Sequence, residues 1–118
     1  MMKALLVASL AFTAVAWGAQ ASDLAKGDQI KAAISGNTVQ GSMVASGVYT
    51  EFYGEDGVIK GKDYTGKWRV EADTMCFQYG SDPETCWGVK IAGDQVTWVK
   101  GGKDEGTGTI VKGNPNKF

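Results

Sequence analysis

Aromatic side chains are the residues of this sequence best suited to bind a ligand. Trp68, Trp87 and Trp98 lie in three separate runs in which apolar and polar residues alternate. Tyr53 ends a fourth such run. In a barrel of sufficient width, these four candidate binding residues would line a cup for one small apolar or planar ligand. Because about eight short strands leave little free space, rings that simply fill a core are the other and more usual interpretation.

Catalytic and metal chemistry have few suitable residues here. The sequence contains no histidine, which removes the usual general base and the commonest metal ligand. Serine and lysine occur without a recognisable nucleophile motif. Carboxylates such as those of Glu55-Asp56 and Asp104-Glu105 fall in expected turns, where acidic residues are common for structural reasons. Glu55-Asp56-Gly57 lacks the spaced oxygen ligands of a calcium loop. We therefore expect no enzyme, no metal site and no cofactor.

The two cysteines, Cys76 and Cys86, could pair or could belong to a zinc or redox site. Their spacing is not C-x-x-C, and there is no histidine to complete a zinc shell. Two cysteines in a short exported chain most often form a disulfide. We therefore expect a Cys76–Cys86 disulfide and no reactive thiol.

The first 21 residues have the pattern of a cleavable signal peptide. Met1-Met2-Lys3 is a short basic start, and Ala4–Trp17 is an uncharged, mainly apolar run that falls short of the ~20 residues of a membrane-spanning helix. Ala19-Gln20-Ala21 supplies the small residues that signal peptidase requires. The sequence thus predicts a signal peptide over 1–21, a single domain over 22–118 with no membrane span, and a periplasmic or secreted location.

The charges of the expected mature chain exclude one class of partner. Without Lys3, 11 basic and 13 acidic residues remain of the 12 and 13 in the full chain, a net charge of about −2. These charges are interspersed and form no basic stripe. Nucleic-acid binding is not expected, because the electrostatic footprint that it needs is missing.

The elements that must position these side chains are mostly strands. Residues 27–36 have apolar spacing typical of a short helix, with Ile30 and Ile34 on one face and Gly36 just past its end. After Gly36 the period changes to two, and turn signals recur at short intervals, among them Gly93-Asp94 as a two-residue hairpin turn. The expected fold is all-β: an antiparallel meander of about seven or eight short strands, with 107–111 in the last. We expect a small closed barrel, with a two-sheet sandwich as the alternative.

The cysteines predict a register for one hairpin. If Cys76 faces Cys86, then Met75 opposes Trp87 and Phe77 opposes Thr85. The apolar residues of both strands then share one face, and the disulfide lies on the other. It would link the two strands on the outer face of the hairpin and would not belong to the main core.

Several motifs together resemble a family of small exported proteins that is frequent in alphaproteobacteria and uncharacterised in function, a domain of unknown function. The likeness covers nearly all of the expected mature chain and rests on Ile34-Ser35-Gly36-Asn37-Thr38, Gly41, Tyr53, Asp56-Gly57, Gly66-Lys67-Trp68-Arg69-Val70-Glu71, Asp73-Thr74-Met75-Cys76, Cys86-Trp87-Gly88-Val89 and Gly113-Asn114-Pro115. It implies export and a single domain and brings no activity. Gly66-Lys67-Trp68 alone is weakly similar to the Gly-x-Trp motif of lipocalin- and avidin-type barrels.

Two functions remain open from the sequence. The first is an exported, non-enzymatic binding or accessory protein, monomeric, with a small apolar ligand against Trp68, Trp87, Trp98 and Tyr53. The alternative is a protein-interaction module, such as an inhibitor or a cell-envelope partner, that acts through exposed hairpin loops. Inward tryptophans around an open cavity would favour the ligand. A filled barrel with an exposed patch of tyrosines at 49, 53 and 64 would favour the protein partner.

Overall fold

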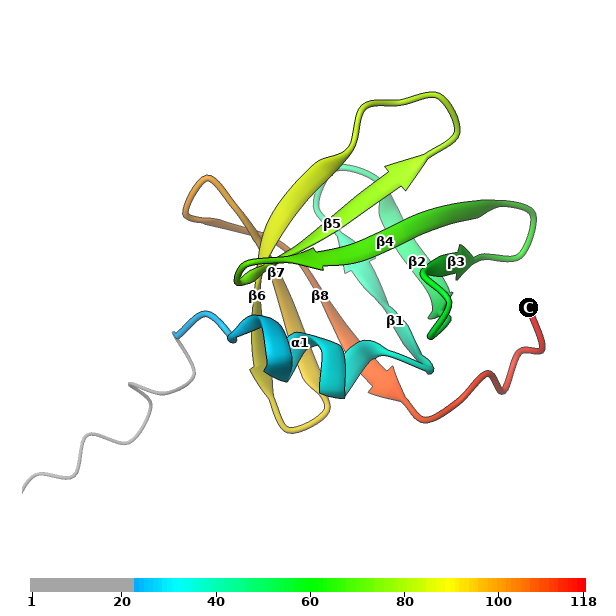
Figure 1. Ribbon diagram of the computed structural model, residues 1–118, viewed down its shortest axis with the longest axis horizontal. Helices are drawn as coiled ribbons and strands as arrows, with labels where there is room; N and C mark the ends of the chain where they lie inside the picture. Colours follow the sequence, from blue (N-terminus) through cyan, green and yellow to red (C-terminus); the bar gives the residue numbers. More distant parts are fainter. Residues whose placement is uncertain (1–22) are drawn as a thin grey trace, which may run out of the picture.

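The computed structural model describes residues 23–118 and shows an eight-stranded antiparallel barrel with one short helix (Figure 1). The signal peptide expected over 1–21 lies outside the described residues. The elements are α1 (Gly27–Ile34), β1 (Asn37–Met43), β2 (Gly47–Tyr53), β3 (Val58–Lys60), β4 (Thr65–Glu71), β5 (Thr74–Tyr79), β6 (Thr85–Ala92), β7 (Gln95–Lys100) and β8 (Lys103–Val111). Each strand pairs with the next, and β8 pairs with β1. The predicted meander is confirmed, and it closes as a barrel.

Local sequence signals account for the turns between strands. Ala92 pairs with Gln95, so Gly93-Asp94 is the two-residue turn that was predicted between β6 and β7. Gly93 has a φ of 61°, in the left-handed region that suits glycine. The β5–β6 hairpin also has the predicted register, with Met75 opposite Trp87 and Cys76 opposite Cys86.

The helix α1 closes one end of the barrel. Its Ile30 and Ile34 side chains are fully buried, and it packs against β1, β4 and β5. The amide of Gly27 donates to Oδ1 of Asp73 in the β4–β5 turn at 2.9 Å. A Cβ at Gly27 would lie 2.2 Å from the Ala72 carbonyl oxygen, so only glycine allows this approach. No helix of the described residues has the length and apolar character needed to cross a membrane.

The two ends of the barrel differ. In an antiparallel meander, the turns that follow β1, β3, β5 and β7 gather at one end. The other end holds the turns after β2, β4 and β6 together with α1, as Figure 1 shows for the β6–β7 turn beside the helix. Small and medium apolar side chains fill the interior nearest α1: Ile30, Ile34, Val39, Ile59, Met75, Val89 and Val96. Aromatic and polar side chains line the interior towards the opposite end.

Candidate functional site

A cavity of about 450 Å³ occupies the end of the barrel opposite α1. Seven aromatic residues contribute to its wall, and two carboxylates are the charged groups among its lining residues. The lining consists of Met43, Ala45, Ser46, Tyr49, Glu51, Tyr53, Tyr64, Phe77, Tyr79, Thr85, Trp87, Trp98 and Glu105. This volume falls within the range of about 300–1,000 Å³ that is usual for small-molecule sites.

Glycines on β8 explain why this end of the barrel is not filled. Gly106 and Gly108 are buried and place no side chain in the interior. A Cβ at Gly108 would lie 2.4 Å from the Tyr49 hydroxyl, and one at Gly106 would lie 2.3 Å from the Met43 sulfur. The two side chains therefore pack directly on the β8 backbone, which leaves the middle of the barrel free.

The carboxylate of Glu51 is the polar centre of the cavity. Glu51 is only 6% exposed and accepts hydrogen bonds from three tyrosines on different segments. The Tyr53 hydroxyl donates to Oε1 at 2.8 Å, and the Tyr64 hydroxyl donates to Oε2 at 2.8 Å. The Tyr79 hydroxyl lies 3.0 Å from both oxygens. Among the described residues, no lysine or arginine forms an ion pair with Glu51.

The environment of the tyrosines keeps their hydroxyls protonated. Burial, followed by the charge of Glu51, raises the pKa of Tyr53 and of Tyr79 well above the ordinary value of 10. Burial, followed by the hydrogen bond to Glu51, raises the pKa of Tyr64. A phenolate beside the carboxylate would add a second buried negative charge. The tyrosines therefore act as hydrogen-bond donors.

A second chain of hydrogen bonds includes Tyr49 of β2, two residues before Glu51, and extends to β7 and β8. The indole Nε1 of Trp98 donates to the Tyr49 hydroxyl at 2.7 Å, which in turn donates to the Thr107 carbonyl at 3.0 Å. The rings of Trp98 and Phe77 meet edge to face with 5.5 Å between centroids, and Tyr53 meets Phe77 in the same manner at 6.3 Å. These contacts hold the rings in place, because the polar groups of Trp98, Tyr49 and Tyr53 each have a hydrogen-bond partner.

The structure separates the four aromatic residues that the sequence singled out. Tyr53, Trp87 and Trp98 line the cavity together. Trp68 does not line it, although it is buried: its Nε1 donates to the Gly54 carbonyl at 2.9 Å, near the β2–β3 turn. Its ring packs against Tyr53, 6.0 Å between centroids, and so supports the cavity wall from behind. The tyrosines at 49, 53 and 64 face the cavity and form no surface patch.

Glu51 was not predicted as a site residue. The carboxylates considered from the sequence were those in turns, whereas Glu51 lies within β2 between Tyr49 and Tyr53. A signal was present, because residues two apart on a strand share a face. A carboxylate in step with two inward aromatics is therefore a buried charge, which is unusual without a partner or a role.

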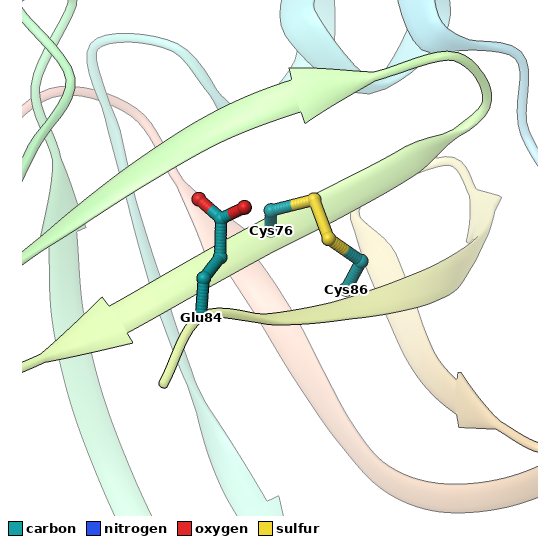
Figure 2. A group of neighbouring side chains, drawn as sticks. All are labelled: Cys76, Glu84 and Cys86. Atoms are coloured by element: carbon teal, nitrogen blue, oxygen red, sulfur yellow. A yellow bond between two sulfur atoms is a disulfide. The ribbon is translucent and has the colours of Figure 1, made fainter. Parts of the chain in front are cut away.

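The predicted disulfide between Cys76 and Cys86 is present and lies outside the core. The two residues oppose each other on β5 and β6, with 3.9 Å between their Cα atoms. Figure 2 shows the Glu84 carboxylate beside the two sulfur atoms. Because both sulfurs are consumed by the disulfide, this group does not supply thiolate ligands for a metal.

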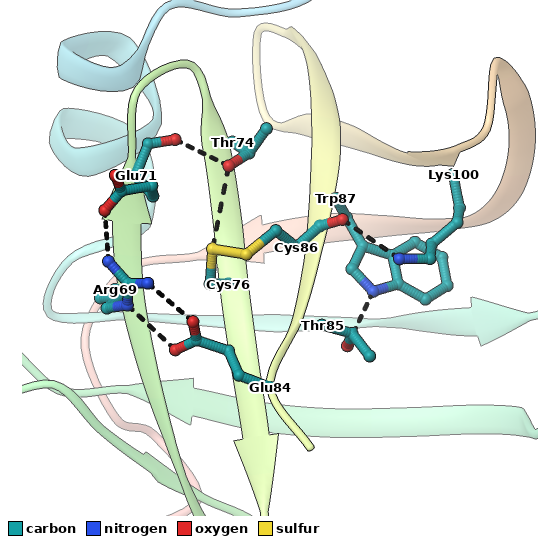
Figure 3. The surroundings of a disulfide bond; sticks show 9 residues. All are labelled: Arg69, Glu71, Thr74, Cys76, Glu84, Thr85, Cys86, Trp87 and Lys100. Carbon is teal, nitrogen blue, oxygen red and sulfur yellow. Dashed lines mark hydrogen bonds and ion pairs between the residues drawn. A yellow bond between two sulfur atoms is a disulfide. The ribbon is translucent and has the colours of Figure 1, made fainter.

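Charged side chains lie beside the disulfide, on the side of Cys76 (Figure 3). The guanidinium of Arg69 makes two hydrogen bonds to Glu84, at 2.9 and 2.7 Å, and also contacts Glu71. Hydrogen bonds from Arg69 lower the pKa of Glu84 below its ordinary value of 4.5. Cys76 is fully buried, whereas Cys86 is exposed.

We compared the chain with protein-family models, with curated proteins and with solved structures, and no match was found in any of the three comparisons.

Proposed function

We propose that the protein is an exported, non-enzymatic binding protein that holds one small, largely apolar ligand in the cavity of the barrel. The observation that carries this proposal is the aromatic-lined cavity of about 450 Å³ at the end opposite α1. Protein interiors are normally close-packed, so an internal space of this size favours a role in ligand binding. The disulfide supports export, since disulfides persist in oxidising compartments.

Native mass spectrometry of the protein recovered from the exported fraction of its own host tests this proposal. We expect a removable mass at one equivalent per chain, on a polypeptide that begins at Ser22 and is two hydrogens lighter than its reduced form. A bare monomer, after purification without detergent or organic solvent, would contradict the proposal.

Two tryptophans provide a matched pair of variants for the same experiment. Trp98→Phe and Trp68→Phe each remove one indole ring and one N–H hydrogen bond, to Tyr49 and to Gly54 respectively. Only Trp98 lines the cavity. We expect Trp98→Phe to release the ligand, whereas Trp68→Phe lowers stability and retains it.

A protein partner is the second candidate function. Val44 and Val48 are 79% and 88% exposed, and both lie near the mouth of the cavity, in the β1–β2 turn and at the start of β2. Exposed apolar side chains at one end of the barrel favour a docking surface. The native mass spectrum distinguishes the two functions, because a protein partner would add a polypeptide mass that Val44→Ser with Val48→Ser removes.

A further inference from the structure

We propose that the cavity selects an organic cation, and specifically one that carries a quaternary ammonium group on an apolar body. This inference rests on the proposed function, because it names the class of ligand that the same cavity would hold. It follows from three properties of the wall: its charge, its hydrogen-bonding capacity and its aromatic surface.

The charge of the wall is negative and uncompensated. Glu51 and Glu105 line the cavity, and no lysine or arginine is among its lining residues. In the described part of the chain, the lysines and arginine that form ion pairs do so with other carboxylates. A buried charge without an opposite charge is costly. A cationic ligand would supply that opposite charge, whereas an anionic ligand would add to the repulsion.

Most of the hydrogen-bonding capacity of Glu51 is already used. A carboxylate offers about four lone-pair sites. The hydroxyls of Tyr53, Tyr64 and Tyr79 donate three hydrogens to its two oxygens, and that of Tyr79 is shared between both. Glu51 therefore presents a negative charge with at most one free acceptor site, fewer than the three N–H donors of a primary ammonium group need. A quaternary ammonium group has positive charge and no N–H, so it loses nothing here, whereas a primary ammonium group would leave donors unpaired.

The aromatic surface of the wall suits such a group. Aromatic faces attract desolvated cations, and clusters of aromatic rings are a known means of binding quaternary ammonium groups. Within residues 23–118, Lys100 lies 5.5 Å from the centroid of Trp87, and no lysine or arginine stacks on the rings of Trp98, Tyr49 or Tyr79. We therefore assign the contact with the ligand's cation to the wall formed by Trp98, Tyr49 and Tyr79 with Glu51.

Three probes that share a benzyl group test the inference on the full exported protein. They are benzyltrimethylammonium, its uncharged carbon isostere neopentylbenzene, and benzylammonium. Binding is followed by tryptophan fluorescence and by isothermal titration calorimetry after removal of any native ligand. We expect benzyltrimethylammonium to bind about tenfold or more tightly than either of the other probes.

Glu51→Gln isolates the charge, and Glu55→Gln is its matched control. Glu55 is exposed, lies in the β2–β3 turn near α1 and is outside the cavity. We expect Glu51→Gln to abolish most of the preference for benzyltrimethylammonium over neopentylbenzene and to leave neopentylbenzene binding little changed. Retained binding of the isostere shows that this variant is folded. Glu55→Gln should keep the full preference.

Tyr64→Phe tests the hydrogen-bonding argument with a gain of binding. Tyr64 is 45% exposed at the mouth, so loss of its hydroxyl should not impair folding. The substitution frees one acceptor site on Oε2 of Glu51. We expect benzylammonium to bind more tightly to this variant than to the native protein, while benzyltrimethylammonium changes little.

Two results would overturn the inference. The first is an isostere that binds as tightly as the cation, which would leave the cavity as a site for neutral apolar ligands and the proposed function intact. The second is no binding of the cation at millimolar concentration. In that case the native mass spectrum alone decides whether the cavity holds another class of ligand, so the inference and the proposed function fail separately.

Discussion

The hydroxyl of Tyr79 lies 3.0 Å from both carboxylate oxygens of Glu51, although 28 residues separate the two in the chain. Tyr79 ends β5, and Glu51 lies on β2, so the contact crosses the interior of the barrel. Since Tyr53 and Tyr64 donate to the same carboxylate, one side chain ties three separate parts of the wall together. The cavity is therefore shaped by its polar contacts as well as by its apolar ones.

Glu51→Gln should destabilise the fold. The amide nitrogen of glutamine cannot accept a hydrogen bond, so at least one of the three tyrosine hydroxyls loses its acceptor. We expect the free energy of unfolding to fall by about 1–3 kcal/mol. Urea unfolding followed by tryptophan fluorescence measures it, and Glu55→Gln should stay within about 0.5 kcal/mol of the native protein. A variant as stable as the native protein would show that the network contributes nothing.

Tyrosine ionisation should reveal the network at alkaline pH. The pKa of each of the four tyrosines is raised above its ordinary value of 10, by burial first. Because the folded pKa values exceed the unfolded ones, this contribution to stability is complete below pH 10 and is lost as the pH rises through the folded values. We expect little tyrosinate absorbance near pH 10 in the folded protein and the full signal in guanidinium. Ordinary titration of the folded protein would contradict the burial of these hydroxyls.

Loss of the disulfide should cost a sizeable share of the stability. The cross-link spans 10 positions of the chain. In the chain-entropy model, loss of a cross-link that closes a loop of this size lowers the free energy of unfolding by about 2.5–3 kcal/mol. Urea unfolding of the Cys76→Ala, Cys86→Ala double variant measures this loss, and reduction of the native protein should give a similar value. An unchanged midpoint would mean that the hairpin register is fixed without the bond.

The contribution of the Arg69–Glu84 ion pair to stability should decrease in acid. Hydrogen bonds from Arg69 lower the pKa of Glu84, so this contribution to stability is present above the unfolded value of 4.5 and is lost as the pH falls through the lower folded value. Unfolding midpoints measured across that acidic range should fall less steeply for Glu84→Gln than for the native protein. Because Glu84 is well solvated, we expect a small effect. The same pH dependence of the unfolding midpoint in both proteins would contradict a stabilising role of the Arg69–Glu84 pair.

Closure of the barrel should depend on Gly41. A Cβ at this position would lie 2.0 Å from the Thr107 carbonyl oxygen, a backbone atom of the paired strand β8. We expect Gly41→Ala to cost about 3 kcal/mol or more. Gly88→Ala is the control, because its Cβ would meet the flexible end of Leu24 at 3.0 Å. That variant should lose less than about 1 kcal/mol by thermal unfolding. Equal effects would contradict the close approach of β1 and β8.

Much of the fold could be predicted because its signals are local. The alternation of residues in β2 and β5, the glycine turn at Gly93 and the face of Ile30 and Ile34 each depend on residues a few positions apart. The Cys76–Cys86 register was predictable for the same reason, since a direct pairing fixes the neighbours of both residues.

The site depended on contacts that the sequence does not record. Trp68 and Trp98 have the same local pattern, but the barrel directs one indole to the Gly54 carbonyl and places the other in the cavity wall. Glu51 gains its three tyrosine partners only when β2, β5 and the segment before β4 meet around one interior. The sequence by itself determined the strands, the turns, the helix and the disulfide. Tertiary structure decided which buried faces meet and where space remains, because closure of β1 on β8 sets the angle of every inward side chain.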